Sequence, residues 1–166
     1  MFSTPMRAVA VFHHDKKVQG TVYFTEEPAH RRVRIDIDLV GTALKPNTLH
    51  GFHVHECGDL TDQCESMCAH FNPYGKKHGC PGKKERHVGD LGNLVVDSHG
   101  QARYTTYDDV IQLRGSKCNI LGRGLIVHAD PDDCGEGVFS DSLVTGHAGK
   151  RVACAVIGYA STQKGK

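Results

Sequence analysis

The segment Arg32–Val40 shows the clearest pattern in the chain, because apolar and charged residues alternate along it. Val33, Ile35, Ile37 and Leu39 are apolar, and charged residues separate them. A period of two is typical of a β-strand with one face on a core and the other in water. The pattern therefore predicts a strand in an antiparallel sheet.

Seven further short segments favour strands, because they are rich in branched or aromatic residues and are bounded by turn residues. They are residues 7–12, 18–24, 51–56, 91–97, 102–107, 124–128 and 151–159. No segment shows a convincing helical period. Eight short strands separated by turns predict an all-β fold, an antiparallel sandwich or a closed barrel.

Length and charge narrow the class of protein. A chain of 166 residues predicts a single domain, with a core of about residues 7–160 and a flexible tail from Ser161. A net charge of +1 argues against a general nucleic-acid binder, so we interpret Lys76-Lys77 and the segment 83–86 as a solvated basic face. The sequence has no apolar run that could span a bilayer and no signal-peptide core, which predicts a cytoplasmic protein without membrane contact.

The chain has 12 histidines, and His53 and His55 lie two apart on a predicted strand. Residues two apart on a strand project from the same face, so these imidazoles could hold one metal ion. His128 ends another predicted strand, where it is either a third ligand or a buried neutral histidine. A flat set of four nitrogens would indicate copper, and a tetrahedral set would indicate zinc.

The segment from Cys57 to Asp90 has no helical or strand period and is rich in glycine. A loop this long needs something to order it. His70, His78, His87 and Asp90 offer three nitrogens and one carboxylate, a closed tetrahedral set that suits a structural zinc ion. The alternative is a solvated polar loop.

Several longer motifs together resemble the copper/zinc superoxide dismutase family, in order and over nearly the whole chain. They are Gly51-Phe52-His53-Val54-His55-Glu56, His70-Phe71-Asn72-Pro73, Lys77-His78-Gly79, the segment 86–93, Val127-His128 and the segment 149–154. The resemblance implies an eight-stranded antiparallel Greek-key β-barrel or sandwich with two long functional loops. It also implies a homodimer, with a copper chaperone as a further partner.

The resemblance also assigns roles. Copper would be held by His53, His55, His70 and His128. Zinc would be held by His70, His78, His87 and Asp90, with His70 as the bridging ligand. Asp132 would hydrogen-bond one ligand of each metal, Arg151 would guide the superoxide anion, and Cys64 and Cys154 would form the intrasubunit disulfide.

The implied reaction is the disproportionation of superoxide to O₂ and H₂O₂ by Cu(II)/Cu(I) cycling, a form of antioxidant defence in which His70 supplies a proton. The chain departs from the family near the mouth of the site. Val144 and Asp130 stand where basic residues are common, which predicts weaker electrostatic steering of the substrate. His147 replaces a usual asparagine and is expected near the surface, and His50 is expected to brace the loops by hydrogen bonds.

The remaining cysteines are less constrained. Cys68 and Cys80 could form a second disulfide or remain thiols, and we favour the bond. Cys118 and Cys134 are expected to be free. Cys57 stands where an apolar residue often meets the second subunit.

Three other functions compete with the enzyme. A metal-binding module without turnover would lack one of the copper histidines or the arginine. All four histidines and Arg151 are present here. A purely structural β-sandwich leaves the histidines unexplained. A nucleic-acid role for the lysine-rich segments has the least support.

Overall fold

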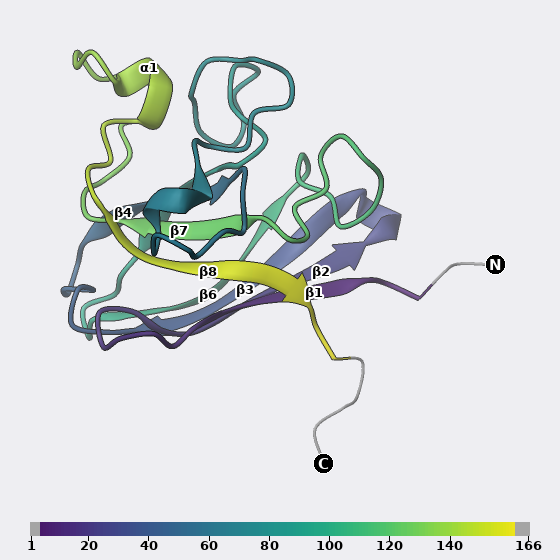
Figure 1. Cartoon of the computed structure of the whole chain (residues 1–166), viewed down its shortest axis with the longest axis horizontal. Coiled ribbons are helices and arrows are strands. Elements are labelled where there is room, and N and C mark those ends of the chain that lie inside the picture. The colour runs from purple at the N-terminus through teal and green to yellow at the C-terminus, as the bar shows by residue number, and fades with distance from the viewer. Residues whose placement is uncertain (1–3, 162–166) are drawn as a thin grey trace.

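The computed structural model describes residues 4–161, and eight antiparallel strands form a nearly closed barrel (Figure 1). The hydrogen-bonded order is β5-β4-β7-β8-β1-β2-β3-β6. The strands are β1 (Arg7–Phe12), β2 (Gln19–Glu27), β3 (Arg32–Val40), β4 (Leu49–His55), β5 (Asp90–Val95), β6 (Gln101–Asp108), β7 (Gly124–His128) and β8 (Arg151–Tyr159). The all-β Greek-key prediction is confirmed.

The apolar residues of β3 face the core, as the sequence predicts. Val33, Ile35, Ile37 and Leu39 are buried in the main core, and the residues between them are more exposed. Ile35 pairs with Phe24 and Ile37 with Val22 on β2, so the apolar side chains of both strands share one face. The apolar surface removed from water in this way is the main stabilising term of the fold.

Strand ends differ slightly from the prediction. β2 continues through Glu27 and stops where Pro28 begins a short 3₁₀ helix, η1 (Pro28–His30). Proline has no N–H to donate to a strand ladder, which explains the stop. β5 begins at Asp90, one residue before the predicted start, while β7 and β8 have the predicted bounds.

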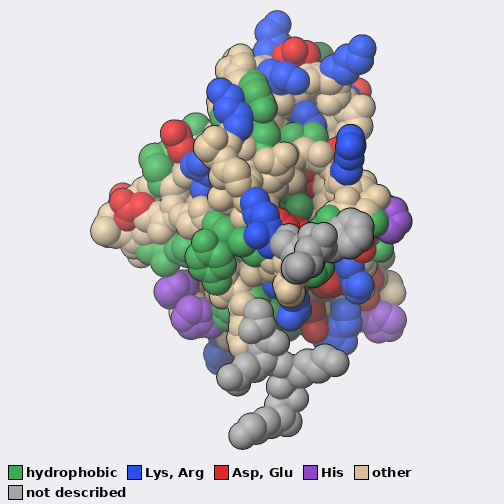
Figure 2. Space-filling model, turned by 90° about the vertical axis from the view of Figure 1, so that its right-hand side faces the viewer, with side chains coloured by type: hydrophobic (Ala, Val, Ile, Leu, Met, Phe, Trp, Pro, Cys, Tyr) green, Lys and Arg blue, Asp and Glu red, His purple; other side chains and the backbone are tan. Residues whose placement is uncertain are grey.

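Two long loops rise from the same side of the barrel, above β4 and β7 in Figure 1. The first joins β4 to β5 and contains the 3₁₀ helix η2 (Glu65–Met67); the second joins β7 to β8 and contains α1 (Ser142–Thr145). In the space-filling view, Lys and Arg side chains gather at this same upper end (Figure 2). Among residues 4–161, no helix is long and apolar enough to cross a membrane. The predicted tail lies mostly outside the described residues.

Two disulfides cross-link the loops. Cys64–Cys154 ties the first loop to β8, as the family resemblance implied. Cys80 bonds to Cys134 in the second loop. The predictions of a Cys68–Cys80 bond and of a free Cys134 are therefore wrong, because the two long loops meet in space although their cysteines are 54 residues apart.

Arg86 corrects the expectation of a solvated basic face over residues 83–86. Its side chain is buried and donates to Asp108 Oδ2 at 2.7 Å and to the carbonyl oxygens of His87 and Val88. A buried charge needs such partners, and the two bonds to carbonyl oxygens hold the backbone at His87 and Val88. The lysines of the segment are exposed as expected.

Candidate metal centre

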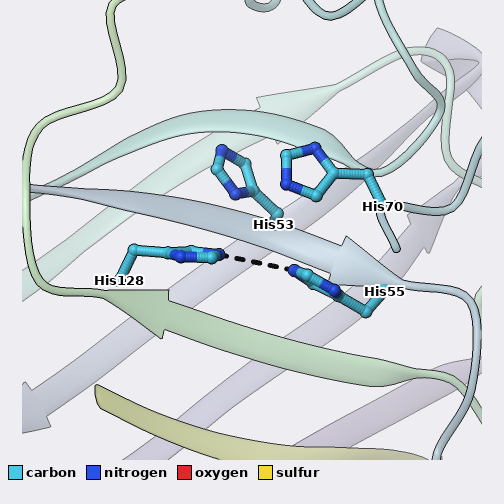
Figure 3. Close-up of side chains that lie close together, drawn as sticks. All are labelled: His53, His55, His70 and His128. Carbon is cyan, nitrogen blue, oxygen red and sulfur yellow. Dashed lines mark hydrogen bonds between the residues drawn. The ribbon is translucent and has the colours of Figure 1, made fainter. Parts of the chain in front are cut away.

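Four imidazoles converge beneath the two loops. His53 and His55 come from β4, His128 from the last position of β7, and His70 from the first loop (Figure 3). One ligand atom from each lies within 4.8 Å of the others, and all four side chains are buried. His55 Nε2 and His128 Nε2 are 3.4 Å apart. This set, the first cluster, could hold one metal ion through four nitrogens.

A second cluster consists of His70, His78, His87 and Asp90. Asp90 Oδ1 lies 2.9, 3.0 and 3.2 Å from the Nδ1 atoms of His70, His78 and His87. A tetrahedral zinc ion with bonds of about 2.0 Å would separate its ligands by about 3.3 Å. The observed spacing fits such a site. Hydrogen bonds from the Gly79 and His87 amides hold Asp90 Oδ2.

His70 belongs to both clusters. Its Nδ1 lies at the second cluster beside Asp90, while its Nε2 is free to face the first. An isolated bridge to His55 on β4 fixes the backbone at this point. One imidazole is thus placed between the two groups of ligands.

Three buried nitrogens in the described part of the chain have no hydrogen-bond partner: His53 Nδ1, His70 Nε2 and His78 Nδ1. A buried polar atom without a partner costs about 1–3 kcal/mol. All three belong to the two clusters. They destabilise the metal-free protein, and they are the atoms that a metal ion would bind. The donor sets therefore fit two metal ions.

Burial keeps the imidazoles of the first cluster neutral, the form that binds metal. It lowers the pKa of His53 to about 3 and of His128 to about 4, and it lowers the pKa of His55 and His70 as well. Neighbouring imidazoles add to the effect, since two of them cannot easily be charged at this separation.

His78 behaves differently because two carboxylates face it. Burial alone would lower its pKa, but the hydrogen bond to Asp132 and the nearby Asp90 carboxylate outweigh burial and raise the pKa to about 9. The pKa of Asp90 is well below its ordinary range, since its close contacts with three histidines outweigh its burial. The second cluster is therefore prepared to hold positive charge.

Asp132 connects the clusters from outside. Its Oδ2 lies 2.6 Å from His53 Nε2, and its Oδ1 lies 2.8 Å from His78 Nε2. Asn93 on β5 fixes the Asp132 backbone through two hydrogen bonds. Gly146 adopts φ +70° beside this carboxylate, where a Cβ would overlap Asp132 Oδ1. One carboxylate thus orients one imidazole of each cluster.

Backbone carbonyls orient two further histidines of the first cluster. His55 Nδ1 hydrogen-bonds the carbonyl of Cys68 at 2.9 Å, and His128 Nδ1 that of Gly149 at 3.1 Å. His50 Nδ1 in turn hydrogen-bonds the His128 carbonyl at 2.8 Å, which confirms its predicted bracing role. The bonds at Nδ1 of His55 and His128 leave the Nε2 atoms of these two rings facing each other in the cluster, 3.4 Å apart.

A cavity of about 930 Å³ opens onto the first cluster. His55, His70 and His128 form its floor, and its wall includes two acidic and two basic side chains, Glu65, Asp141, Lys150 and Arg151. Arg151 donates to the carbonyl of Cys64 at 2.7 Å and to that of Cys68. Exposed Val144 also lines the cavity, where it contributes no positive charge. Weaker electrostatic steering of the superoxide anion stays a prediction.

The structure brings all predicted ligand candidates together and leaves His147 outside both clusters, exposed and paired with Asp141 at 2.7 Å. Sequence reasoning missed Asn93, Arg86 and the Cys80–Cys134 bond. Arg86 and Asn93 did have a signal, because both stand in the quoted motif 86–93.

These features define an all-β protein with two adjoining histidine-rich metal sites. The copper/zinc superoxide dismutase family model matches residues 18–157, and the chain belongs to that family. It is 58% identical to a Cu-Zn superoxide dismutase of Paramecium bursaria Chlorella virus 1, over 94% of this chain and 80% of that protein. It is 52% identical to one from Candida albicans, over 92% of this chain and 97% of the other.

Among solved structures, the clock protein EA4 matches with a TM-score of 0.86 and 43% identity, covering 95% of this chain and 97% of that one. The chain is accordingly an enzyme that disproportionates superoxide, with copper and zinc as its cofactors.

Proposed function

We propose that the first cluster holds copper and the second holds zinc, with His70 as the shared ligand. The observation that carries this proposal is the set of three unpaired buried nitrogens. His53 Nδ1 and His70 Nε2 would serve copper, and His78 Nδ1 would serve zinc. The closed set of three histidines and one aspartate suits a structural zinc ion, and imidazole nitrogens suit copper.

Copper, when bound, supplies the one-electron redox chemistry that the side chains cannot. The protein's own groups do the rest. The Arg151 guanidinium lies at the cavity wall, where it attracts and orients the superoxide anion. His70 lines the cavity, and its Nε2 can hold and release a proton for the peroxide product when that nitrogen is not bound to copper. Asp132 keeps His53 and His78 in place through the cycle.

Arg151 offers a direct test of anion guidance. We expect Arg151→Gln to lower kcat/KM by roughly 10- to 100-fold, because a positive charge beside a cavity raises anion encounter on that scale. Copper and zinc contents should stay unchanged, since Arg151 belongs to neither cluster. Arg103→Gln is the matched control, because it removes the same charge from an exposed position paired with Asp38 on the barrel. Equal losses in the two variants would contradict the proposed role.

Asp132→Asn tests the shared role of Asp132 at both clusters without using activity. The substitution keeps the shape but replaces one acceptor oxygen by an NH₂ group. We expect the affinity for both metals to fall by about 10- to 100-fold, the usual effect of losing an outer partner of metal ligands. Competition with a chelator, followed by metal analysis, measures this. Asp130→Asn, at an exposed position, should leave both affinities unchanged. Loss of neither metal, or of one alone, would refute the shared role.

The proposal also covers the location of the protein, its oligomeric state and the source of its copper. We infer a cytoplasmic homodimer that receives copper from a chaperone, and membership in the family supports each point. Native mass measurement tests the dimer: a mass of two chains is expected, and a mass of one chain at micromolar concentration would contradict it.

A further inference from the structure

Two thiols face each other outside both metal clusters. Cys57 Sγ and Cys68 Sγ lie 3.0 Å apart, although neither cysteine is in a disulfide. Cys57 is half-buried and Cys68 is exposed. The third free thiol, Cys118, is buried and lies 3.5 Å from the Tyr74 hydroxyl.

The backbone aligns the two cysteines as neighbours on adjacent antiparallel segments. His55 pairs with His70, and the Glu56 amide donates to the Ala69 carbonyl at 2.9 Å. The Cys57 amide then donates to the Met67 carbonyl at 3.2 Å. A disulfide has an S–S distance of about 2.05 Å, so the sulfurs need to approach by only about 1 Å. The hydrogen bonds on both sides can persist during that movement.

Cys68 is also held in an unusual backbone conformation, with φ 65° and ψ −154°. This region is essentially restricted to glycine, and another residue stays there only when its surroundings hold it. Its carbonyl accepts hydrogen bonds from His55 Nδ1 and from Arg151. The two cavity residues thus fix the Cys68 backbone, and its neighbour Ala69 lines the cavity over the first cluster.

We propose that Cys57 and Cys68 form a peroxide-responsive thiol pair that closes reversibly into an intrachain disulfide. The oxidant is hydrogen peroxide, the product of the enzyme's own reaction. On the proposed function, it is released into the cavity that Ala69, the neighbour of Cys68, lines. The partner thiol is already within reach.

The chemistry balances in two steps. The exposed Cys68 sulfur attacks one oxygen of H₂O₂ and the O–O bond breaks, which gives a sulfenic acid and, with the thiol proton, one water. The Cys57 sulfur then attacks the Cys68 sulfur and the S–O bond breaks, which gives the disulfide and a second water. The two sulfurs lose two electrons in all, and H₂O₂ gains them.

Alkylation and mass spectrometry of the copper- and zinc-loaded enzyme test the proposal. After treatment with a small excess of added H₂O₂, the number of alkylatable thiols should fall from three to one, with Cys118 the one that remains. A peptide linked through Cys57 and Cys68 should appear within a single chain. Mild thiol treatment should restore both sites.

Two variants identify the order of steps. In Cys57→Ser, Cys68 should accumulate as a sulfenic acid that dimedone captures. In Cys118→Ser, disulfide formation should proceed at the unchanged rate. The proposal fails if Cys57 and Cys68 stay alkylatable after peroxide, if Cys118 is oxidised at the same rate, or if the new bond joins two chains. Because peroxide is added directly, these outcomes do not depend on which cluster holds which metal.

Discussion

His128→Ala should remove copper and superoxide dismutase activity while zinc stays bound. His128 contributes to the first cluster and has no part in the second. Its loss leaves three nitrogens in the first cluster, and activity should fall by at least about 1,000-fold, as when one member of a catalytic unit is removed. Metal analysis and superoxide consumption on the same sample measure both effects.

His147→Ala is the matched control for this variant. His147 is exposed, lies in the second loop and stacks on Phe139 with ring centroids 3.6 Å apart. Its loss should leave both metals and the activity in place. Retention of copper by His128→Ala, or equal loss of zinc, would contradict the assignment of the clusters.

The double substitution Cys80→Ser/Cys134→Ser should lower the free energy of unfolding of the metal-free protein by about 4 kcal/mol. The estimate follows from the entropy of closing a loop of 54 residues in the chain-entropy model. The bond also joins the two loops beside the His78–Asp132 contact, and the Cys134 amide donates to Asp132 Oδ1 at 2.7 Å. We therefore expect weaker zinc binding as well.

Urea denaturation at fixed pH, with a chelator present, measures the stability difference. Cys68→Ser is the control, because it changes an exposed thiol without touching either cross-link. A double variant as stable as Cys68→Ser would show that this disulfide does not stabilise the fold.

The architecture could be predicted from the sequence because strand periodicity is local. In β3, the alternation shows which residues face the core and which face water. Eight such segments and no helices are compatible with only a few architectures. Strand ends could not be placed to the residue, since Glu27 extends β2 until the ring of Pro28 removes the next donor.

Several members of the two clusters could also be predicted, because His53 and His55 share a strand face and the first loop needs an ordering element. The place of His70 in both clusters came from the family resemblance. Contacts between the two loops could not be predicted from the sequence. The sequence does not show that Cys80 meets Cys134, or that Arg86 is buried against Asp108. Both depend on how segments distant in the chain approach each other, and spacing along the sequence does not encode that approach.

The most direct test of the whole account is superoxide consumption measured together with copper and zinc on one sample. We predict that activity rises in proportion to copper when zinc is held at one ion per chain, and that zinc alone gives none. Full loading with both metals and no activity above the uncatalysed rate would contradict the assignment of this site as the catalytic centre.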